Sequence, residues 1–237
     1  MQVFDLKDKK EYIKEVMILE HNEWGENPEV NFDKRIDKKI KKYEENINDL
    51  YFCKLVLLDN NTLIGFISIF PHDGEEINLT PWYATMYVKK EYRGKGYSKI
   101  LNDAILKEAK KRNITVSCDL NFRKKLWSKE KAGKVMGELC KYIDYCIANE
   151  EDAKDVFGIE ADDTDITTGK LNREGYISVA KKLTDKFGFK GVAITLRESL
   201  SANDNNWSGM LYTNGEAHFS KKYAMHIVDR VGGGDSF

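Results

Sequence analysis

Hydrophobic positions in the first half of the chain follow a helical period and then a strand period. Apolar residues recur every three or four positions over residues 8–24 and 33–48, which predicts two amphipathic helices. Short runs rich in aromatic and β-branched residues then predict three strands, and a helix follows that ends near Arg112. The strands are residues 51–58, 63–70 and 82–88, with Asp59-Asn60-Asn61-Thr62 as a hairpin turn between the first two.

From Ile114 onward strands and helices alternate. Helices are predicted at residues 129–147 and 172–187. Strands are predicted at Ile114–Leu120, 145–148, 191–196, 207–213, 216–220 and 223–229, with an Asn214-Gly215 hairpin signal. Such alternation favours a parallel sheet covered by helices, whereas the first half predicts a mixed sheet of another kind. We therefore predict an α/β chain built from two different parts.

Length and charge limit the classes of function that the chain can have. The chain has 237 residues, which is about 1.6 domains at roughly 150 residues each. Lys plus Arg is 38 and Asp plus Glu is 39, so the net charge is −1. Because phosphate binding by charge needs a basic excess, we expect no nucleic-acid partner and no membrane partner. No apolar stretch approaches about 18 residues, and the first residues are too polar for a signal peptide.

Four cysteines occur without a CxxC pair and without a histidine at zinc spacing. They are Cys53, Cys118, Cys140 and Cys146. This pattern predicts reduced, mostly buried thiols and a cytoplasmic location.

The first chemical signal is a glycine-rich loop, Arg93–Ser98, between a predicted strand and a predicted helix. Glycines allow a tight turn and a close approach of the backbone to a ligand. The free N–H groups of the first helical turn and the helix dipole favour an anion such as a pyrophosphate. A glycine turn with a basic solvated face is the alternative reading.

With its context, TPWYATMYVKKEYRGKGYSKILNDAILKEA, this loop resembles the acetyl-CoA-binding motif of the GNAT acetyltransferases, over residues 1–112. The resemblance implies an N-acetyltransferase with acetyl-CoA as cofactor and a small amine as acceptor. It implies that Tyr87 and Val88 line the pantetheine arm. It also implies that the pyrophosphate is held by Arg93, Gly94, Gly96, Tyr97 and Ser98.

The general base of this part stays open among Asp73, Glu75 and Glu76, and for each of them the sequence favours a plain surface carboxylate. The family continues past this helix with a strand, a helix and a strand, whereas the sequence after Arg112 looks different. We expect a domain over residues 1–112 that is incomplete at its C-terminal end.

Residues 114–237 resemble the ribokinase-like (PfkB) carbohydrate kinases, and within them the 2-keto-3-deoxygluconate kinases. Four separated motifs carry the resemblance: Asp119–Trp127, Asn149–Ala153, Thr195–Ser199 and Asp229–Phe237. It implies ATP-dependent phosphorylation of a sugar acid at a partial ribokinase-like parallel sheet between helix layers. We expect residues 113–237 to form a segment that lacks the family's N-terminal half and the helix after the catalytic loop.

The resemblance assigns roles whose chemistry suits phosphoryl transfer. Asp235 would accept the sugar hydroxyl proton, and the N–H groups of Gly232, Gly233 and Gly234 would stabilise the transferred phosphoryl group. Asn121 and Arg123 would bind the sugar acid, since a guanidinium fork matches a carboxylate. Asn149 and Asp152 would tune Mg²⁺ binding. The nucleotide would be flanked by Thr195, Arg197 and Ser199.

Three hypotheses follow. The first is a GNAT-like enzyme whose sheet is completed by Ile114–Leu120. The second is a carbohydrate kinase that carries an unrelated N-terminal domain. The third is a catalytically inactive fusion that still binds acetyl-CoA. An unpaired edge of the parallel sheet favours self-association in each case.

Overall fold

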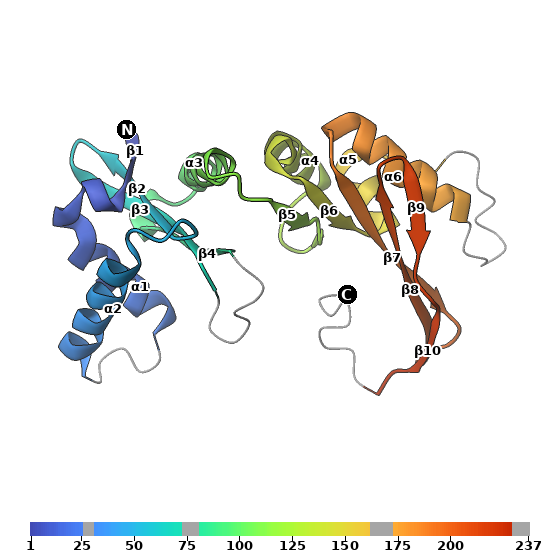
Figure 1. Ribbon diagram of the computed structural model, residues 1–237, viewed down its shortest axis with the longest axis horizontal. Coiled ribbons are helices and arrows are strands. Elements are labelled where there is room, and N and C mark those ends of the chain that lie inside the picture. The colour runs from blue at the N-terminus through green and yellow to red at the C-terminus, as the bar shows by residue number, and fades with distance from the viewer. Residues whose placement is uncertain (26–30, 73–80, 162–172, 229–237) are drawn as a thin grey trace. The chain divides into compact units, whose positions relative to one another are not determined.

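The computed structural model describes residues 1–25, 31–72, 81–161 and 173–228 (Figure 1). The chain divides into two compact units, Met1–Ile114 and Thr115–Phe237, which we call the first and second units. Each unit has its own sheet and its own hydrophobic core. The α/β class is confirmed.

The first unit contains one sheet and three α-helices among its described residues. Strand β1 (Gln2–Asp5) leads through two 3₁₀ turns, Leu6–Asp8 and Lys10–Tyr12, into α1. The remaining elements are α1 (Ile13–Trp24), α2 (Phe32–Asn46), β2 (Cys53–Asp59), β3 (Thr62–Phe70), β4 (Trp82–Val88), a 3₁₀ turn (Lys90–Tyr92) and α3 (Tyr97–Lys111).

The first sheet is antiparallel throughout, in the order β1-β2-β3-β4. The hairpin between β2 and β3 closes on the pair Asp59 and Thr62, and Asn60 and Asn61 have φ of 45° and 65°. Asparagine tolerates this left-handed region better than most residues, and two such residues match the twist of the strands. The predicted hairpin is confirmed.

Alternate residues of β3 face opposite helices. Phe66 packs into a core cluster with residues of α1 and α2, among them Val16 and Ile36. Its neighbour Gly65 faces the other way, where a β-carbon would lie 3.3 Å from Leu101 Cδ1 of α3. The sheet therefore has helices on both faces, and β3 is buried along nearly its whole length.

Three features of the first unit differ from the sequence prediction, and the first is that its sheet is antiparallel rather than mixed. The predicted helix over residues 8–24 begins as an α-helix only at Ile13, because 3₁₀ turns precede it. Strand β1 was not predicted. It has only four residues, and its pairing partner is β2, with Val3 opposite Leu57. A short strand that forms only by pairing with a distant segment shows little recognisable pattern in its own residues.

The second unit alternates strands and helices. Its elements are β5 (Ser117–Asp119), α4 (Lys129–Leu139), a 3₁₀ turn (Cys140–Tyr142), β6 (Tyr145–Ala148), α5 (Glu150–Phe157), α6 (Arg173–Phe187), β7 (Gly191–Ser199), β8 (Asp204–Thr213), β9 (Glu216–Phe219) and β10 (Tyr223–His226).

The second sheet is mixed. Strands β5, β6 and β7 are parallel neighbours, as the alternation predicts, and β8 pairs antiparallel with β7. Both β9 and β10 then pair with β8. The Asn214-Gly215 turn joins β8 to β9, with φ of 52° and 82°, which confirms the second hairpin signal.

One face of the second sheet forms the larger core. Alternate residues of β7 lie in one cluster with Leu183 of α6 and Cys146 of β6. These residues of β7 are Val192, Ile194 and Leu196, each at most 2% exposed. The apolar positions that predicted α6 and β7 are therefore the positions that join them.

Two expectations for the second unit are wrong. The helix predicted over residues 129–147 ends at Leu139, because a 3₁₀ turn and then β6 occupy the rest. The segment Ile114–Leu120 does not complete the first sheet, since β5 pairs in parallel with β6, Cys118 opposite Cys146. This pairing places Leu120 in the core of the second unit. It rules out the sheet completion that the first hypothesis assumes, and leaves the glycine-loop resemblance of residues 1–112 unaffected.

Candidate functional site

The outer edge of β4 is one of the two open edges of the first sheet among the described residues. Among the described residues β4 pairs with β3 alone, so the N–H and C=O groups of its other edge are not used by the sheet. The strand carries a bulge, because one residue of β3 lies between the pairs Phe66–Tyr87 and Ser68–Ala84, whereas β4 has two. A bulge twists a strand and re-aims its side chains. The Thr85 hydroxyl at the bulge donates to Ser68 Oγ at 3.0 Å.

The loop after β4 turns on two glycines in left-handed conformation. Gly94 has φ of 78° and Gly96 has φ of 81°. A β-carbon built on either would meet no atom within 4 Å, so the space over this backbone is open. Both features suit a ligand that lies directly on the main chain.

Gly96 is also the N-cap of α3. It has no side chain that could accept from the first turn, and that turn, which begins at Tyr97 and Ser98, contains no acidic residue. The free N–H groups and the dipole of this 15-residue helix therefore point positive charge at the open space. Ser98 is exposed and Tyr97 is half-buried.

Arg93 folds back over the end of β4. Its Nε donates to the Val88 carbonyl at 2.9 Å, and its guanidinium carbon lies 5.5 Å from the centroid of the Tyr87 ring. Tyr87 itself stacks on Phe66, with ring centroids 5.6 Å apart. The guanidinium also lies 4.0 Å from Glu23 Oε2, so the arginine holds a partly balanced positive charge where the strand enters the glycine loop. The candidate bases Asp73, Glu75 and Glu76 lie outside the described residues.

A buried ion pair joins Lys54 of β2 to Glu20 of α1, and the sequence pattern did not predict it. Lys54 is 2% exposed and donates to Glu20 of α1, whose other oxygen accepts from Lys39 Nζ at 3.0 Å. Burial raises the pKa of Glu20, but attraction to the two lysines outweighs burial and holds that pKa below its ordinary value. The one signal was a lysine at an inward position of an otherwise apolar strand.

In the second unit, the predicted residues after β5 and β6 lie together. The Phe122 N–H donates to Asp152 Oδ1 at 3.1 Å, which ties the loop that carries Asn121 and Arg123 to α5. The Asn149 side chain caps α5, with Oδ1 accepting from the Asp152 N–H at 2.7 Å. The carboxyl ends of β5 and β6 are thereby joined through two side chains.

Burial raises the pKa of Asp152, and the two backbone hydrogen bonds it accepts only partly oppose this. Asp152 is 7% exposed. Its carboxylate and the amide of Asn149 are the oxygens predicted to act on Mg²⁺. Among the described residues, no group of three or more His, Cys, Asp or Glu side chains is arranged to hold a metal ion.

The predicted nucleotide residues lie along β7. The register places Ala148 opposite Ile194, so Asn149 and Thr195 come next to each other at the same level of the sheet. Farther along, Arg197 Nε and the Ser199 hydroxyl both donate to Asn205 Oδ1, at 2.9 and 3.1 Å. Asn205 is buried and was missed, because nothing in its local sequence marks it.

The remaining predicted kinase residues are outside the described part of the chain. These are Gly232, Gly233, Gly234 and Asp235.

Comparison with known proteins assigns relatives to both parts. The model of the acetyltransferase (GNAT) family matches residues 16–125, which include the whole glycine loop. The match passes Ile114 and enters the second unit. The crystal structure of 2-dehydro-3-deoxygluconokinase from Thermotoga maritima is 50% identical over 58% of this chain, with a TM-score of 0.53.

The chain resembles two transferase families. It spans 40% of the length of the Thermotoga maritima kinase. A GNAT-family acetyltransferase structure from Staphylococcus aureus is 19% identical over 48% of this chain and 95% of its own, with a TM-score of 0.40. A predicted acetyltransferase with acetyl-CoA from Clostridium acetobutylicum is 21% identical over 49% of this chain and 77% of its own, with a TM-score of 0.38. Within the described ranges, no helix is both long and apolar enough to cross a membrane.

Proposed function

We propose that the first unit is GNAT-like, binds acetyl-CoA and transfers its acetyl group to an amine. The observation that carries the proposal is the loop at Gly94 and Gly96, which opens the N-terminus of α3 onto empty space. An anion there meets backbone N–H groups, the positive end of the helix dipole and the guanidinium of Arg93. A pyrophosphate fits this set of donors.

Groups of the chain itself account for the binding of the pantetheine arm and for the removal of the amine proton. The open edge of β4, at Tyr87 and Val88, offers main-chain donors and acceptors to the amide groups of the pantetheine arm. The bound cofactor supplies the activated acetyl group. The chain positions that group beside the bulge of β4 and removes the proton of the amine with a carboxylate, for which Asp73, Glu75 and Glu76 remain the candidates.

Titration calorimetry with acetyl-CoA tests this proposal. We expect saturable heat from the unmodified chain and at least about a tenfold loss of affinity in Gly96→Glu, because the new carboxylate repels the pyrophosphate. Gly215→Glu is the matched control. Gly215 has φ of 82° and open space within 4 Å, so this variant has the same backbone strain and the same added charge far along the chain.

Unchanged affinity in Gly215→Glu together with the loss in Gly96→Glu supports the site. No heat from the unmodified chain, or an equal loss in both variants, rejects it.

A second candidate function is ATP-dependent phosphorylation of 2-keto-3-deoxygluconate or a related sugar acid by the second unit. Its support is the 50% identity with the Thermotoga maritima kinase. In this reading Asp235 takes the hydroxyl proton, Gly232, Gly233 and Gly234 hold the phosphoryl group, and Asn149 and Asp152 act on Mg²⁺. Arg123 and Asn121 face the sugar acid, and Thr195, Arg197 and Ser199 flank ATP.

A coupled assay for ADP release with Mg-ATP and 2-keto-3-deoxygluconate tests this candidate. We expect Asp235→Asn to lower the rate by about 100-fold or more, because it removes the base. Asp185→Asn, at an exposed position of α6, is the control and leaves the rate unchanged. No product from the unmodified chain rejects this candidate, and acetyl-CoA binding without either transfer reaction is the result that the third hypothesis expects.

Two further proposals concern the cellular location of the chain and its self-association. All four cysteines are free thiols, which supports a cytoplasmic location. The outer edge of β5 is unpaired among the described residues, which supports association of copies through that edge of the second sheet.

A further inference from the structure

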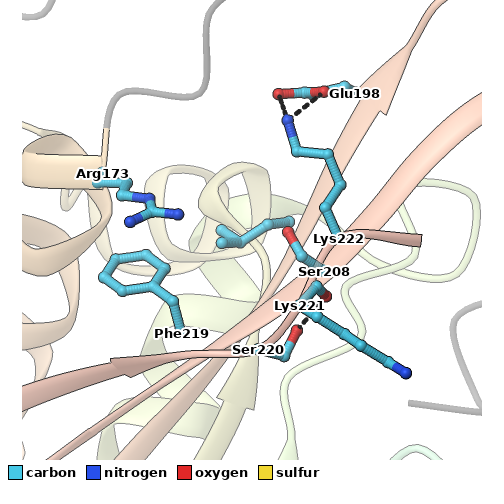
Figure 2. Close-up of a pocket in the computed structure, with 8 residues that line it drawn as sticks. Arg173, Glu198, Ser208, Phe219, Ser220, Lys221 and Lys222 are labelled. Atoms are coloured by element: carbon cyan, nitrogen blue, oxygen red, sulfur yellow. Dashed lines mark hydrogen bonds and ion pairs between the residues drawn. The ribbon is translucent and has the colours of Figure 1, made fainter. Parts of the chain in front are cut away.

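The second unit has a pocket on the side of β7 that faces α6. Its volume is about 380 Å³, within the range typical of small-molecule sites. One wall is the first residue of α6, Arg173, together with Phe219 at the end of β9 (Figure 2). The other walls come from β7, from β8 and from the connection between β9 and β10: Leu196, Glu198, Ser208, Ser220, Lys221 and Lys222.

Arg173 presents its guanidinium to this pocket. The guanidinium carbon lies 4.7 Å from the centroid of the Phe219 ring, and Figure 2 shows the group directed across the pocket toward the strand that carries Ser208. Stacking on a ring holds the guanidinium plane but uses none of its N–H donors. No acidic side chain of the described residues forms an ion pair with Arg173. As far as the described residues go, its fork of donors is therefore open to a ligand.

The one carboxylate in the pocket is already neutralised. Lys222 Nζ donates to both oxygens of Glu198, at 2.7 and 2.9 Å, and Asn206 Nδ2 donates to Oε2 at 2.9 Å. These bonds, that of Lys222 first, hold the pKa of Glu198 below its ordinary value. Glu198 thus stays ionised and paired, and Arg173 sets the charge of the pocket interior.

The hydroxyls of the pocket differ. Ser220 Oγ accepts from the Gly209 N–H and donates to the Lys221 carbonyl, both at 2.9 Å, so it is committed to the fold. The Ser208 hydroxyl has no hydrogen-bond partner among the described residues. Leu196, which is 2% exposed, supplies an apolar surface beside it.

We propose that this pocket binds a small organic oxyanion, a carboxylate or a phosphate ester with an apolar part. The guanidinium of Arg173 receives two oxygens in its plane, as a planar fork does with carboxylates and phosphates. Ser208 donates a further hydrogen bond, and the apolar part lies against the ring of Phe219 above the floor formed by Leu196. Leu196 and Glu198 alternate along β7 with Thr195, Arg197 and Ser199, so the site adjoins the residues proposed to flank ATP but shares no lining residue with them.

The test uses phenyl phosphate and benzoate as probes, with inorganic phosphate as the probe without an apolar part. Binding is followed by the amide NMR shifts of Gly209, Ser220 and Lys222 in the full chain. We expect saturable shifts with either aromatic probe and weaker binding of inorganic phosphate. Arg173→Gln should weaken the aromatic probes at least about tenfold, since hydrogen bonds to a charged group are lost.

Lys221→Gln is the matched control. It removes one positive charge from the same rim, but the Lys221 ammonium lies 4.7 Å from the centroid of the Tyr223 ring, and Figure 2 shows its side chain leading away from the pocket. The affinity of the Lys221→Gln variant for the aromatic probes should change by less than about twofold. Equal losses in the two variants would show attraction by net charge alone and overturn the proposal, as would shifts that do not saturate. Because Arg173 is exposed, unchanged shifts in the rest of the spectrum verify that both variants fold.

Discussion

Glu20→Ala is expected to destabilise the first unit by about 3–5 kcal/mol, because it leaves a charged lysine buried without its partner. Lys54 is 2% exposed and lies 5.3 and 5.2 Å from the ring centroids of Phe66 and Phe70. Burial already lowers the pKa of Lys54, and attraction to Glu20 opposes that shift. Without Glu20 the lysine must lose its proton or draw water into the core.

Hydrogen exchange of the β2 and β3 amides during urea unfolding measures this loss in the full chain. The control is Glu45→Ala, which removes a carboxylate 3.9 Å from Lys41 on the solvent face of α2. That pair is exposed, so a change below about 1 kcal/mol is expected. The double variant Glu20→Leu with Lys54→Met should regain most of the loss, because an apolar pair of similar volume needs no charge partner. If Glu20→Ala is no more destabilising than Glu45→Ala, the buried pair has no structural role.

The same pair gives a pH dependence with a definite sign. The folded-state pKa of Glu20 is lowered, so the unfolded chain binds the proton more tightly. Its contribution to stability is present above the unfolded pKa of about 4.3 and is lost as the pH falls through the folded value. The double variant should lack this part of the acid sensitivity.

Gly65→Ala is expected to have the second large effect, because it disturbs both the packing of the first sheet and the strand β4, whose outer edge is proposed to bind acetyl-CoA. A β-carbon at Gly65 would lie 2.3 Å from the Tyr87 carbonyl oxygen and 3.1 Å from Val88 Cα, both main-chain atoms of β4. Since neither can move without the strand, β4 must shift away from β3. We expect a loss of about 2–3 kcal/mol in unfolding free energy, as for overpacked cores.

The shift should also weaken acetyl-CoA binding at least about tenfold, because small displacements of positioning groups are costly. The control is Gly137→Ala in α4, where a β-carbon meets nothing within 4 Å. There alanine should add up to about 1 kcal/mol of stability and leave acetyl-CoA affinity unchanged. Calorimetry on both variants at a temperature where each is folded separates the effects. Unchanged affinity in folded Gly65→Ala would mean that the β3–β4 contact does not shape the site.

Much of the fold was predictable where the signal is local. The β2–β3 hairpin follows from two asparagines that accept positive φ, and α3 follows from a glycine N-cap and one apolar face. The kinase-like motif Asn149–Ala153 was equally local in part, since Asn149 directly follows β6 and caps α5. Such features depend on residues a few positions apart, so the sequence displays them directly.

Apart from the bounds of α1 and α4, the errors concern partners that lie far apart along the chain. The segment Ile114–Leu120 carried a correct strand signal, but its pattern could not show which of the two sheets the strand joins. Its parallel backbone pairing with β6, which places Cys118 opposite Cys146, puts it in the second sheet. The role of Asn205 depends on Arg197 and Ser199 across the β7–β8 ribbon. Neither neighbour can be read from the residues beside Asn205.

By itself, the sequence determined the α/β class, the change of architecture after Ile114, and the resemblance to two transferase families. It also placed the two glycines whose backbone opens α3. Only the tertiary structure decided which sheet takes β5, that Glu20 and Lys54, 34 positions apart, form a buried pair, and that Arg173 faces a pocket. The physical reason is that backbone conformation is governed by near neighbours, whereas burial, ion pairing and cavities depend on which distant surfaces meet.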